Sequence, residues 1–99
     1  MIDITVEHMK IIKDILKKYI VGYEVRAFGS RVNGTARRYS DLDLAIIGKT
    51  KLPKKILYLL REEFAESNLP FRVEIVDYQV VSDEFKRIVQ DKGVKFVFR

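Results

Sequence analysis

The sequence predicts an α/β (α+β) fold, in which a small mixed β-sheet of about four strands is flanked by helices. Along the chain, stretches with apolar residues at helical spacing are separated by short stretches in which apolar and polar residues alternate. The length is a further guide, because 99 residues can bury one hydrophobic core but not two. We therefore expect a single domain over residues 1–99, with the element order α-β-(short α)-β-α-β-α-β.

The predicted helices are recognised by their apolar spacing and by the residues at their ends. The first, over residues 5–21, has apolar residues at intervals of three and four. Asp3 or Thr5 can cap its start, and Gly22 can end it. The other predicted helices are a short turn at 31–34, a helix at 53–67 with a proline in its first turn, and a helix from 82 or 83 through 90.

The predicted strands are rich in β-branched and aromatic residues and lie between turn signals. They cover residues 23–29, 41–48, 71–78 and 94–98. The second begins by alternating and finishes apolar, as a strand buried at one end would, and the last is expected at an edge of the sheet.

Composition excludes several classes of protein. The chain has no cysteine, so disulfides and thiolate metal sites are excluded. It lacks an apolar run of the roughly 18 residues that a membrane span needs, and it does not begin with a signal-peptide pattern, so a cytoplasmic protein without membrane contact is expected. The net charge of +5 suits an anionic partner, although the lysines are spread out as on ordinary solvated surfaces.

Two aspartates stand at the start of the second predicted strand. Asp41 and Asp43 are two residues apart, so both side chains point to the same face, with Cα atoms roughly 6–7 Å apart. Two carboxylates this close repel each other unless a cation neutralises them, and Mg²⁺ is the natural hard ion for oxygen ligands. The alternative is a polar strand entry, in which Ser40 and Asp41 make turn hydrogen bonds.

A glycine and a serine stand at the end of the preceding predicted strand. Gly29 permits a tight turn and a close approach of a ligand to the main chain, and Ser30 adds a hydroxyl donor. The free amides of a helical turn after them would form an anion site. A phosphate cradle beside an acid pair indicates a nucleoside triphosphate together with Mg²⁺, whereas either half alone indicates little.

A site with two metal ions needs a third carboxylate. The third predicted strand offers Glu74 and Asp77, which face opposite sides. Glu74 lies between apolar neighbours, where an acid is unexpected unless it is paired or functional, and it is the preferred candidate. The alternative for Glu74 is an ordinary polar residue on a half-exposed sheet, and turn formation or solvation would account for Asp77.

Gly29-Ser30, ten intervening residues and Asp41-Leu42-Asp43 resemble the signature of the DNA polymerase beta-like nucleotidyltransferases, and in particular of the minimal nucleotidyltransferases. The resemblance implies that Gly29, Ser30 and Arg31 bind the nucleotide. It implies that Asp41, Asp43 and Glu74 are the catalytic residues and ligate two Mg²⁺ ions. The third carboxylate of that family is usually an aspartate, one methylene shorter than the glutamate here.

The resemblance also implies a reaction and a partner. Similar proteins act as antitoxins that transfer AMP from ATP to a tyrosine hydroxyl of a helical HEPN toxin. Two alternatives stay open: a non-catalytic antitoxin that neutralises its HEPN partner by binding, and a small RNA-directed nucleotidyltransferase. Arg38 is a further candidate for phosphate contact, whereas the single histidine, His8, is expected to be a surface or packing residue. Nucleic-acid binding and oligomeric state are left open.

Overall fold

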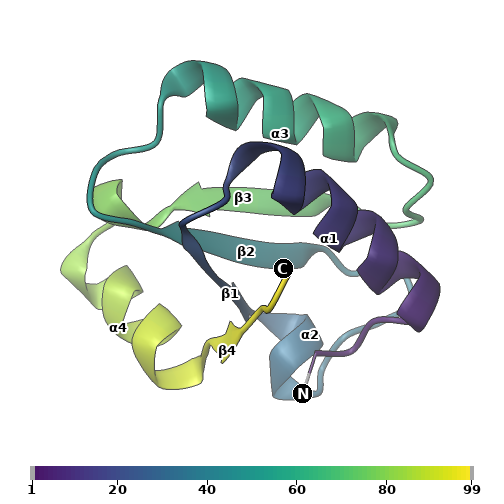
Figure 1. Cartoon of the computed structure of the whole chain (residues 1–99). Coiled ribbons are helices and arrows are strands. Elements are labelled where there is room, and N and C mark those ends of the chain that lie inside the picture. The colour runs from purple at the N-terminus through teal and green to yellow at the C-terminus, as the bar shows by residue number, and fades with distance from the viewer. Residues whose placement is uncertain (1, 99) are drawn as a thin grey trace.

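A computed structural model describes residues 2–98 of the chain, and the two ends of the expected domain, residues 1 and 99, lie outside the described residues. Four strands form one mixed sheet in the order β3-β2-β1-β4, with helices packed around it (Figure 1). The elements are α1 (Val6–Tyr19), β1 (Glu24–Phe28), α2 (Ser30–Asn33), β2 (Leu42–Ile47), α3 (Lys54–Glu66), β3 (Val73–Asp77), a 3-10 turn (Tyr78–Val80), α4 (Asp83–Lys92) and β4 (Val94–Lys95). The predicted fold class and the order of the elements are confirmed.

Side chains at the ends of the helices set where they begin. The Thr5 hydroxyl accepts a hydrogen bond from the His8 amide at 3.2 Å, and so caps α1 as one of the two predicted candidates. Ser82 does the same for α4 through the Phe85 amide at 3.2 Å. Helix α3 begins after Pro53, whose ring needs no amide partner at that position.

The register of the sheet fixes which side chains meet. Strand β1 runs antiparallel to β2, with Phe28 opposite Asp43. Strand β2 runs parallel to β3, with Asp43 opposite Glu74. Parallel neighbours need a long crossover, and α3 supplies it between β2 and β3 (Figure 1).

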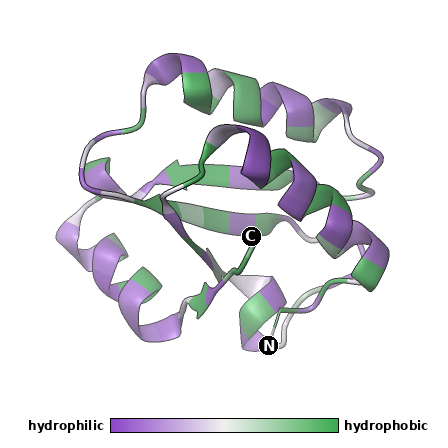
Figure 2. Cartoon of the chain, viewed as in Figure 1, coloured by the Kyte–Doolittle hydropathy of each residue, from purple (hydrophilic) through white to green (hydrophobic). Residues whose placement is uncertain are grey.

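The core consists of two layers of apolar side chains, one on each face of the sheet. Helices α1 and α3 cover the first face, where the fully buried residues include Ile12, Leu16, Leu44 and Leu60. Helix α4 covers part of the second face through a smaller cluster around Val89. Figure 2 shows the pattern as green, apolar central strands under helices whose purple and green segments alternate. The second face is therefore less completely covered, and polar side chains can lie on it.

The last predicted strand is much shorter than expected. The sequence predicts a strand over residues 94–98, but only Val94 and Lys95 pair with β1. After the Phe96 amide donates to the Val25 carbonyl at 2.7 Å, no further pairing follows, and the side chains of Phe96 and Phe98 are buried in the first core layer. The prediction of a strand over residues 94–98 is therefore wrong in its length, because the segment after Lys95 packs two rings into the core instead of continuing the hydrogen-bonded ladder.

None of the helices in the described part of the chain is long and apolar enough to cross a lipid bilayer.

Candidate active site

The turn after β1 lies directly against the second of the predicted carboxylates, Asp43. Gly29 has φ 81° and ψ −156°, a region that essentially only glycine adopts. A β-carbon built at Gly29 would collide with Oδ2 of Asp43. The two halves of the predicted motif, the glycine turn and the aspartate pair, are therefore in contact through Gly29 and Asp43.

The third predicted carboxylate lies beside the second. Asp43 on β2 is the register partner of Glu74 on β3, and neighbouring strands lie about 4.8 Å apart. Both side chains are on the second, less covered face of the sheet, as Asp41 is by its position two residues before Asp43. The structure thus brings together Asp41, Asp43 and Glu74, which the sequence predicted as one group.

The electrostatics of this group are centred on Asp43. Its pKa is raised above the usual value, first because the carboxyl is partly buried and then because Asp41 and Glu74 repel a further negative charge. Arg72 acts in the opposite direction and lowers it. A carboxylate whose ionised form is disfavoured in this way is stabilised by any cation that binds next to it.

Arg72 is the cation that meets this group in the structure. Its Nη2 lies 2.9 Å from Oδ2 of Asp41, and its Nε lies 3.3 Å from Oε2 of Glu74. Sequence reasoning missed this residue. The available signal was its place two residues before Glu74, which puts both side chains on the same face of the strand.

The donor atoms fit a hard divalent ion, because three carboxylates offer only oxygen ligands. As the side chains stand, however, no three histidine, aspartate or glutamate residues among residues 2–98 are arranged to hold a metal ion. Two of the three carboxylates, Asp41 and Glu74, are instead paired with Arg72. Ligation of one ion by all three carboxylates requires side-chain rotation away from that arginine.

The predicted phosphate contact Arg31 is engaged elsewhere. Its side chain is 6% exposed and donates to the carbonyls of Asp3, Arg38 and Ser40 at 2.9, 3.1 and 2.9 Å. Its guanidinium also stacks on the Phe71 ring, 4.1 Å from the centroid. These contacts fasten the loop between α2 and β2 to the rest of the protein, and a role in nucleotide binding stays a prediction.

The other residues of the predicted nucleotide site are more open. Ser30 begins α2 and is half-buried. Arg38 is exposed, and its guanidinium lies 5.4 Å from the centroid of the Tyr39 ring. Contact of either side chain with a nucleotide stays a prediction.

Residues 8–98 match the family described as "Nucleotidyltransferase domain". The chain belongs to this family.

The similarity to individual proteins is more specific than the match to the family. The chain is 45% identical over 89 residues to the probable protein adenylyltransferase MntA of Haemophilus influenzae, and the match covers 90% of this chain and 78% of that protein. A toxin–antitoxin complex solved with AMP-PNP has a chain that matches with a TM-score of 0.76 and 26% identity, over 92% of this chain and 73% of that chain. An MntA–HepT toxin–antitoxin structure matches with a TM-score of 0.69 over 96% of this chain and 74% of that chain, and its 21% identity bears on the fold alone. The resemblance to the minimal nucleotidyltransferases is confirmed.

Asp77, the other acid of β3, has a structural role in the nucleotidyltransferase. Asp77 is buried, and its carboxylate accepts hydrogen bonds from the amides of Leu52 and Gln79 at 2.9 and 3.1 Å. It therefore holds the loop before α3 and caps the 3-10 turn after β3. His8 is a packing residue as expected, with its ring edge-to-face with Phe71 at 5.6 Å.

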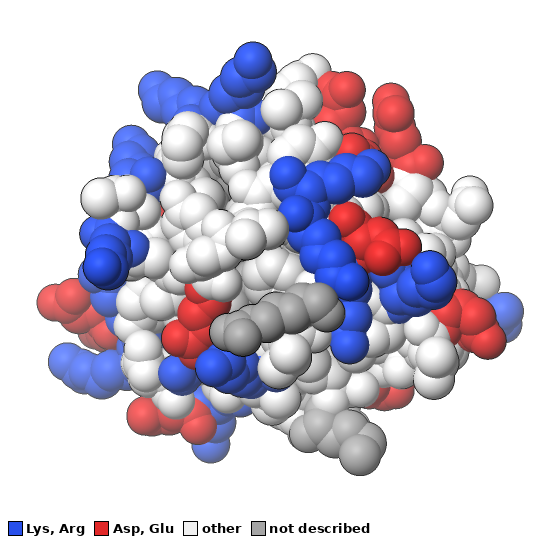
Figure 3. Space-filling view, in the orientation of Figure 1, with Lys and Arg blue, Asp and Glu red and all other residues white. Residues whose placement is uncertain are grey.

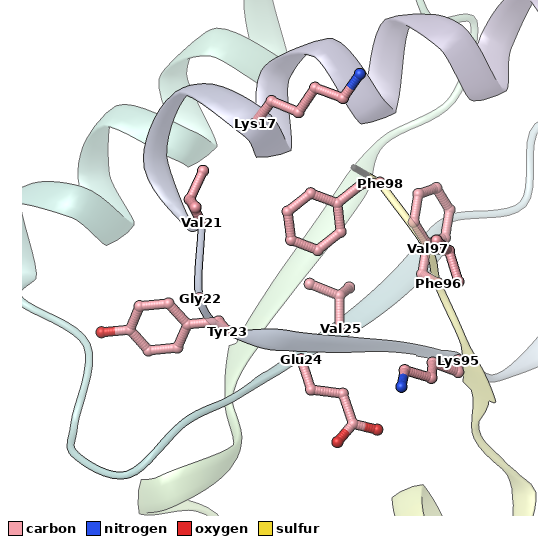
Figure 4. Close-up of a pocket in the computed structure, with 10 residues that line it drawn as sticks. All are labelled: Lys17, Val21, Gly22, Tyr23, Glu24, Val25, Lys95, Phe96, Val97 and Phe98. Carbon is pink, nitrogen blue, oxygen red and sulfur yellow. The ribbon is translucent and has the colours of Figure 1, made fainter.

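Two pockets lie at different places along the sheet. One, of about 810 Å³, is formed by the end of α1, the start of β1 and residues 95–98, with the rings of Phe96 and Phe98 at its side (Figure 4). It lies at the start of β1, whereas Asp43 pairs with the end of that strand. A second hollow of about 430 Å³ follows β3 and α3 and includes Arg72 and Glu74. Of the three predicted carboxylates, Glu74 lines this second hollow, whereas Asp41 and Asp43 are not part of its lining.

The surface charge is mixed. On the face shown in Figure 3, a run of Lys and Arg side chains crosses the middle, with acidic side chains beside it and around the rim.

Proposed function

We propose that this nucleotidyltransferase transfers AMP from ATP to a tyrosine hydroxyl group of a HEPN toxin partner, and that it acts as the antitoxin of the pair. In this proposal residues 1–99 form a single catalytic domain that works in the cytoplasm with Mg²⁺. The observation that carries the proposal is the contact of Gly29 with Asp43, because it joins a phosphate-binding turn to the acidic group. The relatives described as a protein adenylyltransferase and as toxin–antitoxin complexes support the choice of substrate and partner.

Each residue has a distinct task in this reaction. The turn at Gly29 and Ser30 orients the triphosphate, with the main chain able to approach it closely because Gly29 has no side chain. Asp41, Asp43 and Glu74 would hold Mg²⁺, which when bound supplies charge stabilisation at the phosphoryl oxygens. A carboxylate oxygen of Glu74 accepts the proton of the attacking hydroxyl. The hydroxyl oxygen bonds to the α-phosphorus of ATP while the bond from that phosphorus to the bridging oxygen of the β-phosphate breaks, and pyrophosphate leaves.

The open space beside β3 is suited to the acceptor. Glu74 is 46% exposed, and the hollow that includes it is bordered by α3 and the open edge of the sheet. A tyrosine delivered by a second protein can reach Glu74 there without entering the core. The small chain provides the nucleotide side of the site, and the partner provides the acceptor.

The proposal is tested by incubating the chain with a purified HEPN toxin, ATP and Mg²⁺, followed by mass spectrometry of the HEPN protein. We expect a mass increase of one or more AMP groups, placed on tyrosine by peptide mapping. Asp43→Asn should abolish the increase, and Asp91→Asn, an exposed aspartate of α4, is the matched control that should keep it. Full neutralisation of the toxin by Asp41→Asn, Asp43→Asn without any mass change would instead establish an antitoxin that acts by binding.

A further inference from the structure

Arg72 bridges two strands at the acidic group. Its side chain bonds Asp41 before β2 and Glu74 in β3, as described above, with a second contact of 3.3 Å from Nε to Oδ2 of Asp41. Its own carbonyl accepts a hydrogen bond from the Leu42 amide at 2.9 Å, so the backbone of Arg72 is fixed beside the aspartate pair. The guanidinium can therefore move while its point of attachment stays in place.

The exposure of these ion pairs makes them easy to exchange. The side chain of Arg72 is 73% exposed, and those of Asp41 and Glu74 are 37% and 46% exposed. Exposed ion pairs contribute little stability because water screens them and because two flexible side chains must be held in place. A divalent ion that offers twice the charge can displace such an arginine, whereas a buried ion pair would resist displacement.

The arrangement also sets a condition for metal binding. Within residues 2–98 no three acidic or histidine side chains are arranged to hold an ion, and Arg72 engages two of the three carboxylates that would have to converge. An ion that binds Asp41 and Glu74 must take the place of the guanidinium.

We propose that Arg72 is an exchangeable counter-ion, which competes with the divalent cation for Asp41 and Glu74 and so sets the metal affinity of the nucleotidyltransferase. This inference rests on the proposed function, because it takes these carboxylates as metal ligands. Arg72 is a positioning residue in this role. It holds the carboxylates of Asp41 and Glu74 and offsets part of their charge, and it gives way when the cation binds.

The test is a titration of the chain with Mn²⁺ alone, followed by calorimetry and by the electron paramagnetic resonance of free Mn²⁺. Arg72→Gln should bind Mn²⁺ roughly three- to tenfold more tightly than the wild type, in line with the small contribution of exposed ion pairs. Arg87→Gln is the matched control, since it removes the same charge from an exposed position on α4 and should leave the affinity unchanged. Unchanged or weaker binding in Arg72→Gln relative to Arg87→Gln overturns the proposal.

A second measurement uses the unaltered protein. The Nε–H resonance of Arg72 in a ¹⁵N-correlated spectrum should shift with Mg²⁺ concentration along the same curve as the amide of Asp43. A resonance of Arg72 that stays in place while the Asp43 amide shifts overturns the competition. Absence of any Mn²⁺ binding in the wild type overturns the metal site itself, and thereby the proposed function, so the two failures are distinguishable.

Discussion

Asp43 and Glu74 face each other across the parallel pair β2 and β3, although thirty residues, including the rest of β2 and helix α3, separate them in the sequence. Each carboxylate lies on the less covered face of the sheet, and the charge of Glu74 contributes to the raised pKa of Asp43. Repulsion between these carboxylates lowers the stability of the folded state. Groups that destabilise the fold in this way are typical of functional sites. Four predictions follow from this arrangement and its surroundings.

The substitution Asp43→Asn should abolish AMP transfer and stabilise the fold at neutral pH. The raised pKa means that the folded state holds the Asp43 proton more tightly than the unfolded state, so ionisation lowers stability as the pH rises through that pKa. Removing the charge should raise the melting temperature by a few degrees at pH 7, since ~1 kcal/mol corresponds to roughly 4–8 °C in a domain of this size.

The pH dependence of this stabilisation is the sharper check. Below the unfolded pKa of an aspartate, about 3.9, both states are protonated and the variant should have no advantage over the wild type. The melting temperatures of both proteins are measured between pH 3.5 and 7.5, on the order of one scan per half pH unit. The two melting temperatures should converge toward the acid end of this range. A stability difference that grows as the pH falls contradicts the prediction.

Glu74→Gln should reduce the rate of AMP transfer by about 10²- to 10⁴-fold, because the amide cannot accept a proton from the attacking hydroxyl. Glu74→Asp, which keeps a carboxylate on a side chain one methylene shorter, should retain the rate to within roughly tenfold, as expected for a proton acceptor with a shorter reach. The measurement is single-turnover labelling of the HEPN partner with ATP labelled at the α-phosphate.

Asp77→Asn provides the control for both variants, because Asp77 lies on the same strand but accepts hydrogen bonds from two main-chain amides. It should lower the melting temperature and leave the rate per folded molecule unchanged. Equal losses of rate in Glu74→Gln and Asp77→Asn would show that only folding had been disturbed.

Gly29→Ala should disable the site far more than it unfolds the protein. The substitution places a β-carbon against Oδ2 of Asp43 and forces a residue with a side chain into a conformation that costs about 1–3 kcal/mol. We expect transfer to fall at least 100-fold, on the order of the loss when a catalytic group is misplaced by about 1 Å.

Gly22→Ala separates backbone strain from this collision. Gly22 also has a positive φ, 94°, but a β-carbon there meets nothing within 4 Å. Gly22→Ala should therefore lose stability and keep its rate of transfer. The rates are compared at a temperature at which both variants are folded by circular dichroism, and a normal rate in Gly29→Ala would refute the predicted contact.

Arg31→Lys should destabilise the protein by about 2–4 kcal/mol, because a lysine cannot donate to three separate carbonyls or stack on Phe71 as the guanidinium does. Hydrogen exchange of the amides in residues 35–41 should become faster, since the loop loses its attachment. The measurement is denaturant unfolding together with exchange mass spectrometry.

The same variant decides between the two roles of Arg31. If Arg31 instead contacts phosphate, Arg31→Lys should weaken nucleotide affinity while unfolding and exchange stay as in the wild type. The result therefore tests the role predicted from the sequence against the role indicated by the contacts.

Much of the site could be predicted because it depends on local backbone geometry. The alternation of a strand places Asp41 and Asp43 on one face whatever surrounds them, and a glycine after a strand permits the turn that Gly29 makes. The position of Glu74 between two apolar neighbours favours it over Asp77, whose side chain the structure places on the opposite, buried face. The helix caps Thr5 and Ser82 were likewise local features.

Tertiary contacts decided the rest. The sequence by itself determined the order of the elements, the faces of their side chains and the spacing of the glycine turn and the acids, because these follow from periods of two and 3.6 residues along one chain. Only the tertiary structure decided that Glu74 lies opposite Asp43, that Arg31 is buried in a loop, that Arg72 pairs with Asp41 and Glu74, and that β4 has two residues. These features depend on strand register and on side chains distant in sequence, and their energies arise only when the core brings those segments together.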